Sequence, residues 1–103
     1  MPNIQAKTTL TLAFNAAATP QAPSVMWPGG PGTFSAEATW GGGSVTLQTQ
    51  TANGTWVAVG PDTTLSANGI AGFILPKGAE LRALTVTATV VYAYATPFTD
   101  QGF

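Results

Sequence analysis

The chain has 103 residues, with three basic and four acidic residues, a formal net charge of −1, and neither histidine nor cysteine. This composition excludes triads and metal sites built on histidine, together with disulfides, thiol nucleophiles and thiolate ligands. Three basic residues are too few to neutralise a row of phosphates, so we expect no nucleic-acid partner. Low net charge also favours association with other protein.

The sequence carries no pattern typical of export or membrane insertion. The first residues lack a basic leader followed by an apolar run. The most apolar stretch, 81–95, is interrupted by Arg82 and three threonines, and it is shorter than the roughly 20 residues of a spanning helix. We therefore expect neither Sec-type secretion nor a membrane segment.

Two strands are predicted in the N-terminal part of the chain. Positions 4–14 alternate with the period of two that a strand with one buried face requires. The Pro-Gly-Gly-Pro-Gly segment at 28–32 is expected to be a loop, because proline and glycine favour turns. Alternation over 34–40 predicts the second strand, and its apolar face places Trp40 in the core.

A hairpin is predicted in the middle of the chain. Residues 45–49 form its first strand and 56–59 its second, and Asn53-Gly54 supplies the positive φ angles of a two-residue turn. The same Asn-Gly-Thr sequence matches an N-glycosylation acceptor, but the turn explains these residues. Later turn signals frame a short strand at 70–75, and 81–94 is long enough for one bent strand or two.

These elements predict an all-β fold. About six to eight strands, separated by frequent turn signals, favour an antiparallel β-sandwich or a jelly-roll-like barrel. We expect a single β domain over residues 1–103, with extended arms at 1–14 and 97–103.

The carboxylates are the remaining candidates for catalysis. Glycosidases need two carboxylates that flank the sugar bond, and calcium needs six to eight oxygen ligands. Each acidic residue here stands apart from the others in sequence, which is typical of scattered surface charge. We therefore expect no enzyme, no catalytic residue, no cofactor and no metal; a hydrolase that uses Glu37 and Glu80 is the alternative. The four carboxylates are Glu37, Asp62, Glu80 and Asp100.

Large aromatic side chains are the main candidates for a binding surface, since aromatics dominate interfaces as well as cores. Trp27 lies beside the proline-glycine loop, where exposure is expected, and is the first choice for a partner contact. Trp56 follows the hairpin turn and either plugs one end of the sandwich or stands on its surface. Exposed tryptophans of this kind would also suit stacking on sugar rings.

Three of the seven charged residues lie around one turn: Lys77, Glu80 and Arg82. On a strand, Glu80 and Arg82 would point to the same face and could pair. The cluster is interpreted either as a solvated turn or as a polar contact that fixes the register of an interface. The predicted interface residues are Trp27, Trp56, Lys77, Glu80, Arg82, Phe98 and Phe103.

Two stretches resemble small structural proteins of tailed bacteriophages. The first is Gly-Phe-Ile-Leu-Pro-Lys-Gly-Ala-Glu-Leu-Arg-Ala at 72–83, which leads into a Thr- and Val-rich strand ending Val-Val-Tyr-Ala-Tyr at 90–94. The second is Trp-Gly-Gly-Gly-Ser-Val-Thr-Leu-Gln at 40–48, followed by Trp-Val-Ala-Val at 56–59. The resemblance covers 40–59 and 72–94, about half of the chain.

Single-domain phage proteins of this length are often head decoration, or cement, proteins. The resemblance therefore implies a β-rich protein, commonly a homotrimer, that binds the outside of the major capsid protein lattice and stabilises it. It would be made in the host cytoplasm and reside on the outer capsid surface of the virion. The alternative is a carbohydrate- or receptor-binding module of a phage fibre or spike.

Overall fold

The computed structural model describes residues 9–16 and 24–98, and within these ranges it consists of strands and turns without a helix. The strands are β1 (Leu10–Ala16), β2 (Val25–Met26), β3 (Gly30–Thr39), β4 (Ser44–Gln50), β5 (Trp56–Ala58), β6 (Thr64–Leu65), β7 (Gly69–Leu75), β8 (Glu80–Val86) and β9 (Thr89–Pro97).

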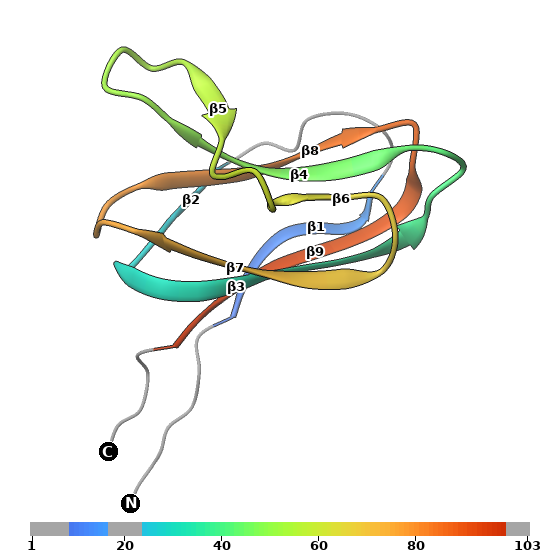
Figure 1. Ribbon diagram of the computed structural model, residues 1–103, viewed down its shortest axis with the longest axis horizontal. Coiled ribbons are helices and arrows are strands. Elements are labelled where there is room, and N and C mark those ends of the chain that lie inside the picture. The colour runs from blue at the N-terminus through green and yellow to red at the C-terminus, as the bar shows by residue number, and fades with distance from the viewer. Residues whose placement is uncertain (1–8, 17–23, 99–103) are drawn as a thin grey trace, which may run out of the picture.

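The strands form two antiparallel sheets that pack face to face (Figure 1). Sheet A has the order β1-β9-β3-β7, and sheet B has the order β2-β8-β4-β5, with β6 beside β4. The predicted all-β sandwich is confirmed. The described residues hold nine strands rather than about six to eight, because β2 and β6 contain two residues each and such short strands show no alternation.

The connections are those of a jelly roll. From β1 to β4 each strand lies in the other sheet from the one before it, and the same holds from β7 to β9. Strands β5 and β6 pair with consecutive parts of the same β4 edge, so they act as one strand interrupted by the loop 59–63. Counted in this way, each sheet has four strands.

The core lies between the sheets and follows the alternation that the sequence predicts. Along most of β3, β4, β8 and β9, buried residues alternate with partly buried or exposed ones, and apolar burial of this kind supplies most of the stability of a small domain. The largest buried side chains are Trp27, Phe34, Leu47, Leu81, Val45 and Val91. Trp40 is only partly buried against this core.

The hairpin between β4 and β5 lies where it was predicted, but its turn is longer. Gln50 pairs with Trp56, which leaves a loop of 51–55. Within this loop Gly54 alone takes a positive φ, and its N–H donates to the carbonyl of Thr51 at 2.8 Å. The expected two-residue turn is therefore wrong. The segment 81–94 divides into two strands, β8 and β9, joined by a turn at 87–88.

The expected loop at 28–32 is also wrong in part, because Gly30, Pro31 and Gly32 belong to β3 and pair with β7. Of the expected arms, residues 1–8 and 99–103 lie outside the described residues, whereas 10–14 belong to β1 and pair with β9.

Candidate functional site on the outer face of one sheet

The solvent-facing side of sheet A carries an unusual set of side chains. Alternation along β3 and β9 turns Ser35, Glu37, Tyr92 and Tyr94 away from the core, and the register places Glu37 opposite Tyr92 and Ser35 opposite Tyr94. On the other side of β3, Ser35 pairs with Ile70 of β7. We call this surface the outer A face; its side chains include Phe14, Thr33, Ser35, Glu37, Ile70, Ile74, Tyr92, Tyr94 and Thr96.

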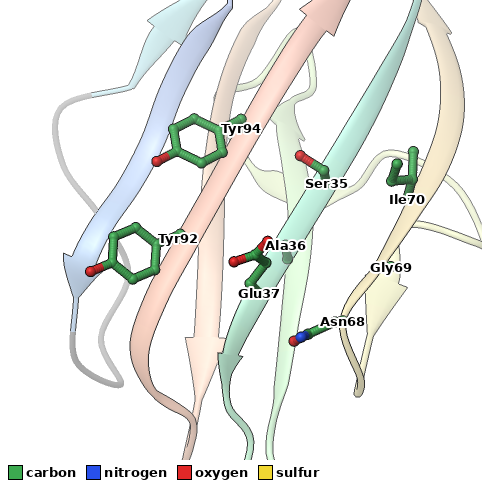
Figure 2. A pocket seen from close by; sticks show the side chains of 8 residues that line it. All are labelled: Ser35, Ala36, Glu37, Asn68, Gly69, Ile70, Tyr92 and Tyr94. Carbon is green, nitrogen blue, oxygen red and sulfur yellow. The ribbon is translucent and has the colours of Figure 1, made fainter.

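An open groove of about 720 Å³ crosses the outer A face. Figure 2 shows the half-buried rings of Tyr92 and Tyr94 side by side along β9, with their hydroxyls directed towards β1. Ile70 and Asn68 form the opposite side of the groove, and the side chains of β3 lie between the two sides. The groove therefore combines aromatic and aliphatic surface with a few polar groups.

Asn68 is the polar group of the groove whose orientation is fixed. Its Oδ1 accepts hydrogen bonds from the indole Nε1 of Trp40 at 2.8 Å and from the backbone N–H of Ala38 at 3.2 Å. Because the oxygen must accept both bonds, the amide orientation is determined and the NH₂ group is left to donate elsewhere. Trp40 therefore holds Asn68 in place at the rim of the groove.

Apolar exposure and scarcity of charge distinguish the outer A face. Phe14, Ile70 and Ile74 are 70%, 71% and 70% exposed. The Phe14 ring meets the Tyr92 ring edge-on at a centroid distance of 5.1 Å, so these two aromatics form one contact surface. Within the described part of the face, Glu37 is the one charged side chain.

Trp27, the residue favoured for a partner contact, is buried, and that prediction is wrong. It is 0% exposed, its ring lies 4.8 Å from the Phe73 ring, and its Nε1 donates to the carbonyl of Gly30 at 3.0 Å. The neighbouring glycines are the reason: a Cβ on Gly32 would lie 2.3 Å from Cη2 of Trp27, so the missing side chain makes room for the indole. Glycine here creates space in the core rather than an exposed loop.

Trp56 stands on the surface of sheet B, so the surface alternative is the one the structure selects. It is half-buried, and the guanidinium of Arg82 lies 4.4 Å from the centroid of its ring. Arg82 also donates from Nε to Oε1 of Gln48 at 2.8 Å. Trp56, Arg82 and Gln48 thus form a cluster on the outside of sheet B, on the opposite side of the sandwich from the groove.

Glu80 and Arg82 do not form the pair that their spacing on a strand permits. Within the described residues, Glu80 accepts a hydrogen bond from Ser24 Oγ, whereas Arg82 turns to Trp56 and Gln48. Lys77 is exposed in the turn before β8. Three of the seven charges are thus close in sequence but separate in their contacts.

The remaining predicted contacts lie near the end of the chain. Phe98 is 52% exposed just beyond β9, and its backbone N–H donates to the carbonyl of Pro31 at 3.0 Å. Phe103 lies outside the described residues.

The described residues bring no metal-binding cluster together. They contain no group of three or more acidic residues that could hold a metal ion. Glu37 lies on sheet A and Glu80 on sheet B, so the pair considered for a hydrolase is divided between the two sheets. A helix long and apolar enough to cross a membrane is not found in the same residues.

Sequence reasoning did not assemble the groove. Tyr92 and Tyr94 stand two positions apart in a predicted strand, which is the signal that both lie on one face. The sequence did not show whether that face is the core side or the solvent side of the strand. In the structure Val91, Ala93 and Ala95 are buried in the core, so the two tyrosines lie on the solvent side. Asn68 was predicted only as part of a turn. Comparison of the chain with protein-family models, curated proteins and solved structures finds no match.

Proposed function

We propose that this protein is a non-enzymatic structural component of a tailed bacteriophage virion, a decoration protein that binds the outside of the major capsid protein lattice. The observation that carries the proposal is the outer A face, where Phe14, Ile70 and Ile74 are each about 70% exposed, Phe14 packs on Tyr92, and Ile70 lines a groove with Tyr92 and Tyr94.

The composition of this face is that of a protein interface. Contiguous apolar surface on a soluble domain marks a site that another molecule covers. Interface cores are enriched in aromatic side chains and depleted of charge, and this face combines Phe14, Tyr92 and Tyr94 with Glu37 as its one charge among the described residues. A static contact of this kind needs no catalytic group.

The outside of sheet B also exposes apolar side chains, Met26 at 63% and Val86 at 51%, but polar side chains on it are paired with one another. Thr46 and Thr64 exchange a hydroxyl hydrogen bond at 3.0 Å, and Arg82 bonds to Gln48 while it stacks on Trp56. Side chains that satisfy one another in this way leave few groups for a partner. We therefore expect sheet A to bind the capsid and sheet B to remain exposed to solvent.

Cosedimentation with capsids tests this orientation. Purified protein is added to particles of the encoding phage from which the native copies have been removed, and the bound fraction is measured. The double variant Ile70→Thr, Ile74→Thr should bind at least tenfold more weakly, because it removes exposed apolar area from the proposed contact surface.

Val86→Thr is the matched control, since Val86 is also exposed and apolar but ends β8 in sheet B. It should bind like the wild type. Equal binding by the double variant and the wild type would contradict the proposed orientation, and no binding by the wild type would contradict the proposed function.

The groove also favours a second function, recognition of a carbohydrate by a fibre or spike module. Tyr92 and Tyr94 offer two neighbouring rings, and the NH₂ of Asn68 and the carboxylate of Glu37 could bond sugar hydroxyls. Trp27 cannot stack on a sugar because it is buried, and Arg82 already occupies one face of Trp56. The site for a sugar is therefore the tyrosine groove.

A glycan array separates this function from capsid binding. Specific binding that Tyr92→Ala or Tyr94→Ala abolishes, and that Trp56→Ala leaves intact, would support carbohydrate recognition. The absence of binding to any glycan, or binding that both tyrosine variants retain, would reject it.

A further inference from the structure

The edges of the two sheets differ in how well they are protected against pairing with another strand. Proteins protect an edge strand by making it short, by bulges, by proline or by charge. Strand β1 has two register shifts against β9, and β2 has two residues. The β5/β6 edge is interrupted by the loop 59–63. Three of the four edges in the described residues therefore oppose pairing.

Strand β7 lacks all of these features. It spans seven residues, Gly-Ile-Ala-Gly-Phe-Ile-Leu, which include neither proline nor charge. All seven residues pair with β3 without a register shift, from Gly69 opposite Ala36 to Leu75 opposite Gly30. Among the described residues, β7 pairs with no other strand. It is a straight, uncharged strand with one free edge.

The register identifies which backbone groups of β7 face outwards. The carbonyl of Pro31 accepts a hydrogen bond from Phe98 beyond the end of β9, so the odd-numbered residues of β3 bond towards β9 and the even-numbered ones towards β7. Ala38, an even-numbered residue next to this region, likewise donates to Asn68 on the β7 side. The partners of even-numbered β3 residues are Gly69, Ala71, Phe73 and Leu75.

The N–H and C=O groups of the remaining residues, Ile70, Gly72 and Ile74, must then point away from the sheet, because hydrogen-bonding direction alternates along a strand. An Ala side chain would fit at Gly72, since the nearest atom to a Cβ there is the Gly32 carbonyl oxygen at 3.9 Å. These three residues form the free edge.

We propose that β7 pairs antiparallel with β7 of a second copy of this chain, around a two-fold axis at Gly72. The three outward-facing residues are symmetric about Gly72, so Gly72 meets its own copy and Ile70 meets Ile74 of the partner. Each of these pairs can exchange both backbone hydrogen bonds, as hydrogen-bonded pairs of an antiparallel ladder do. Sheet A of one copy then continues into sheet A of the other.

The side chains suit this self-pairing. Ile70 and Ile74 are exposed on the same face, so the pairing brings apolar side chains of the two copies together. On the inner face, Ala71 stands opposite Phe73 of the partner, a small side chain against a large one. Because β7 carries no charge, no like charges meet between the two paired strands. The loop 59–63 leaves a hollow of about 170 Å³ beside Gly72 and Ile74, and Asp62 of this loop lines the same hollow.

This inference stands on the geometry of β7 and does not depend on binding to a capsid. It predicts a two-fold dimer, whereas the phage resemblance implies a trimer, and the oligomeric state of the purified chain distinguishes the two. Multi-angle light scattering after size exclusion should give the mass of a dimer for the wild type. A wild-type chain that is monomeric or trimeric at millimolar concentration would overturn the proposal.

Two variants at one position test the strand pairing itself. Gly72→Pro removes an outward N–H that the fold does not use, and proline is tolerated at such edge positions, so this variant should be monomeric. Gly72→Ala keeps the N–H and should remain dimeric. A folded Gly72→Pro protein that stays dimeric would overturn the proposal, as would a monomeric Gly72→Ala.

Cysteine cross-linking tests which residues of the two β7 strands lie opposite each other. This experiment does not require the Gly72→Pro variant to fold. Opposed residues of a hydrogen-bonded pair lie about 5.5 Å apart at Cα, within the range of a disulfide. Because the chain has no cysteine, an introduced thiol is unique. Gly72→Cys should form a covalent dimer on mild oxidation, whereas Ile70→Cys, which faces Ile74 of the partner, should not. Equal cross-linking of both variants, or none at Gly72→Cys, would overturn the register.

Discussion

The indole of Trp27 occupies the space beside Gly32 where any other residue would place a side chain. A Cβ at Gly32 would lie 2.3 Å from Cη2 of Trp27 and 2.8 Å from the carbonyl oxygen of Thr96. One of these neighbours is a buried ring and the other is backbone of the adjacent strand, so neither can move aside without disturbing the core. The close contact between Trp27 and Gly32 therefore makes the start of β3 part of the packing between the two sheets.

Gly32→Ala should lower the free energy of unfolding by about 3 kcal/mol, at the upper end of the usual cost of overpacking a core. Urea unfolding followed by tryptophan fluorescence measures the change. Gly72→Ala is the matched control, because it adds the same methyl group to sheet A at a position with space. An unfolding free energy for Gly32→Ala within error of that control would contradict the observed packing.

Two buried threonines should respond in opposite ways to replacement by valine. Thr85 is buried, and its Oγ1 has no hydrogen-bond partner within the described residues. An unpaired buried hydroxyl destabilises the fold by about 1–3 kcal/mol, so Thr85→Val should raise the free energy of unfolding by about 1 kcal/mol. Thermal unfolding followed by circular dichroism shows whether the variant is more or less stable than the wild type.

Thr63 is the comparison for this test. Its Oγ1 donates to the carbonyl of Gly60 at 2.9 Å and accepts from the N–H of Gly60 at 3.1 Å, which closes the loop between β5 and β6. Thr63→Val leaves the N–H of Gly60 without this acceptor, although the carbonyl of Gly60 keeps a hydrogen bond from the backbone N–H of Thr63 at 3.3 Å, and should lower the free energy of unfolding by about 2 kcal/mol. If the free energy of unfolding changed in the same direction in Thr85→Val and Thr63→Val, the hydrogen bonding of the two hydroxyls would not explain their effects on stability.

Asn68 should support both the fold and the groove. Asn68→Ala removes the acceptor of the Trp40 indole N–H and of the Ala38 backbone N–H, and should cost about 1–2 kcal/mol. The indole proton resonance of Trp40 should shift in the NMR spectrum. Asn53→Ala, in the exposed hairpin loop, should change neither quantity. An unchanged Trp40 resonance in Asn68→Ala would contradict the hydrogen bond.

The fold class followed from the sequence because alternation reports a buried face directly. The segments around Phe34 and Leu47 form strands close to their predicted positions, and their apolar residues are core residues. Short strands could not be predicted in this way. The two residues of β2 and of β6 pair only because β8 and β4 lie beside them, so their structure depends on tertiary contacts.

The candidate site was harder to predict, for a physical reason that Trp27 illustrates. Proline and glycine near a tryptophan predict an exposed loop when glycine is taken only as a turn residue. At Gly32 the absent side chain instead makes room for the ring. Conversely, Ile70 and Ile74 are exposed because they lie on the outer face of sheet A while Ala71 lies on the core side, and the almost wholly apolar sequence of β7 does not reveal which set faces solvent.

The central proposal, that this chain is a decoration protein of a phage capsid, is tested most directly by the number of copies of the chain in purified phage particles. Quantitative mass spectrometry against the major capsid protein gives that number. A decoration protein that covers the lattice predicts a copy number comparable to that of the major capsid protein. A copy number that fits a single tail, portal or spike assembly, or absence from the particle, would contradict the account.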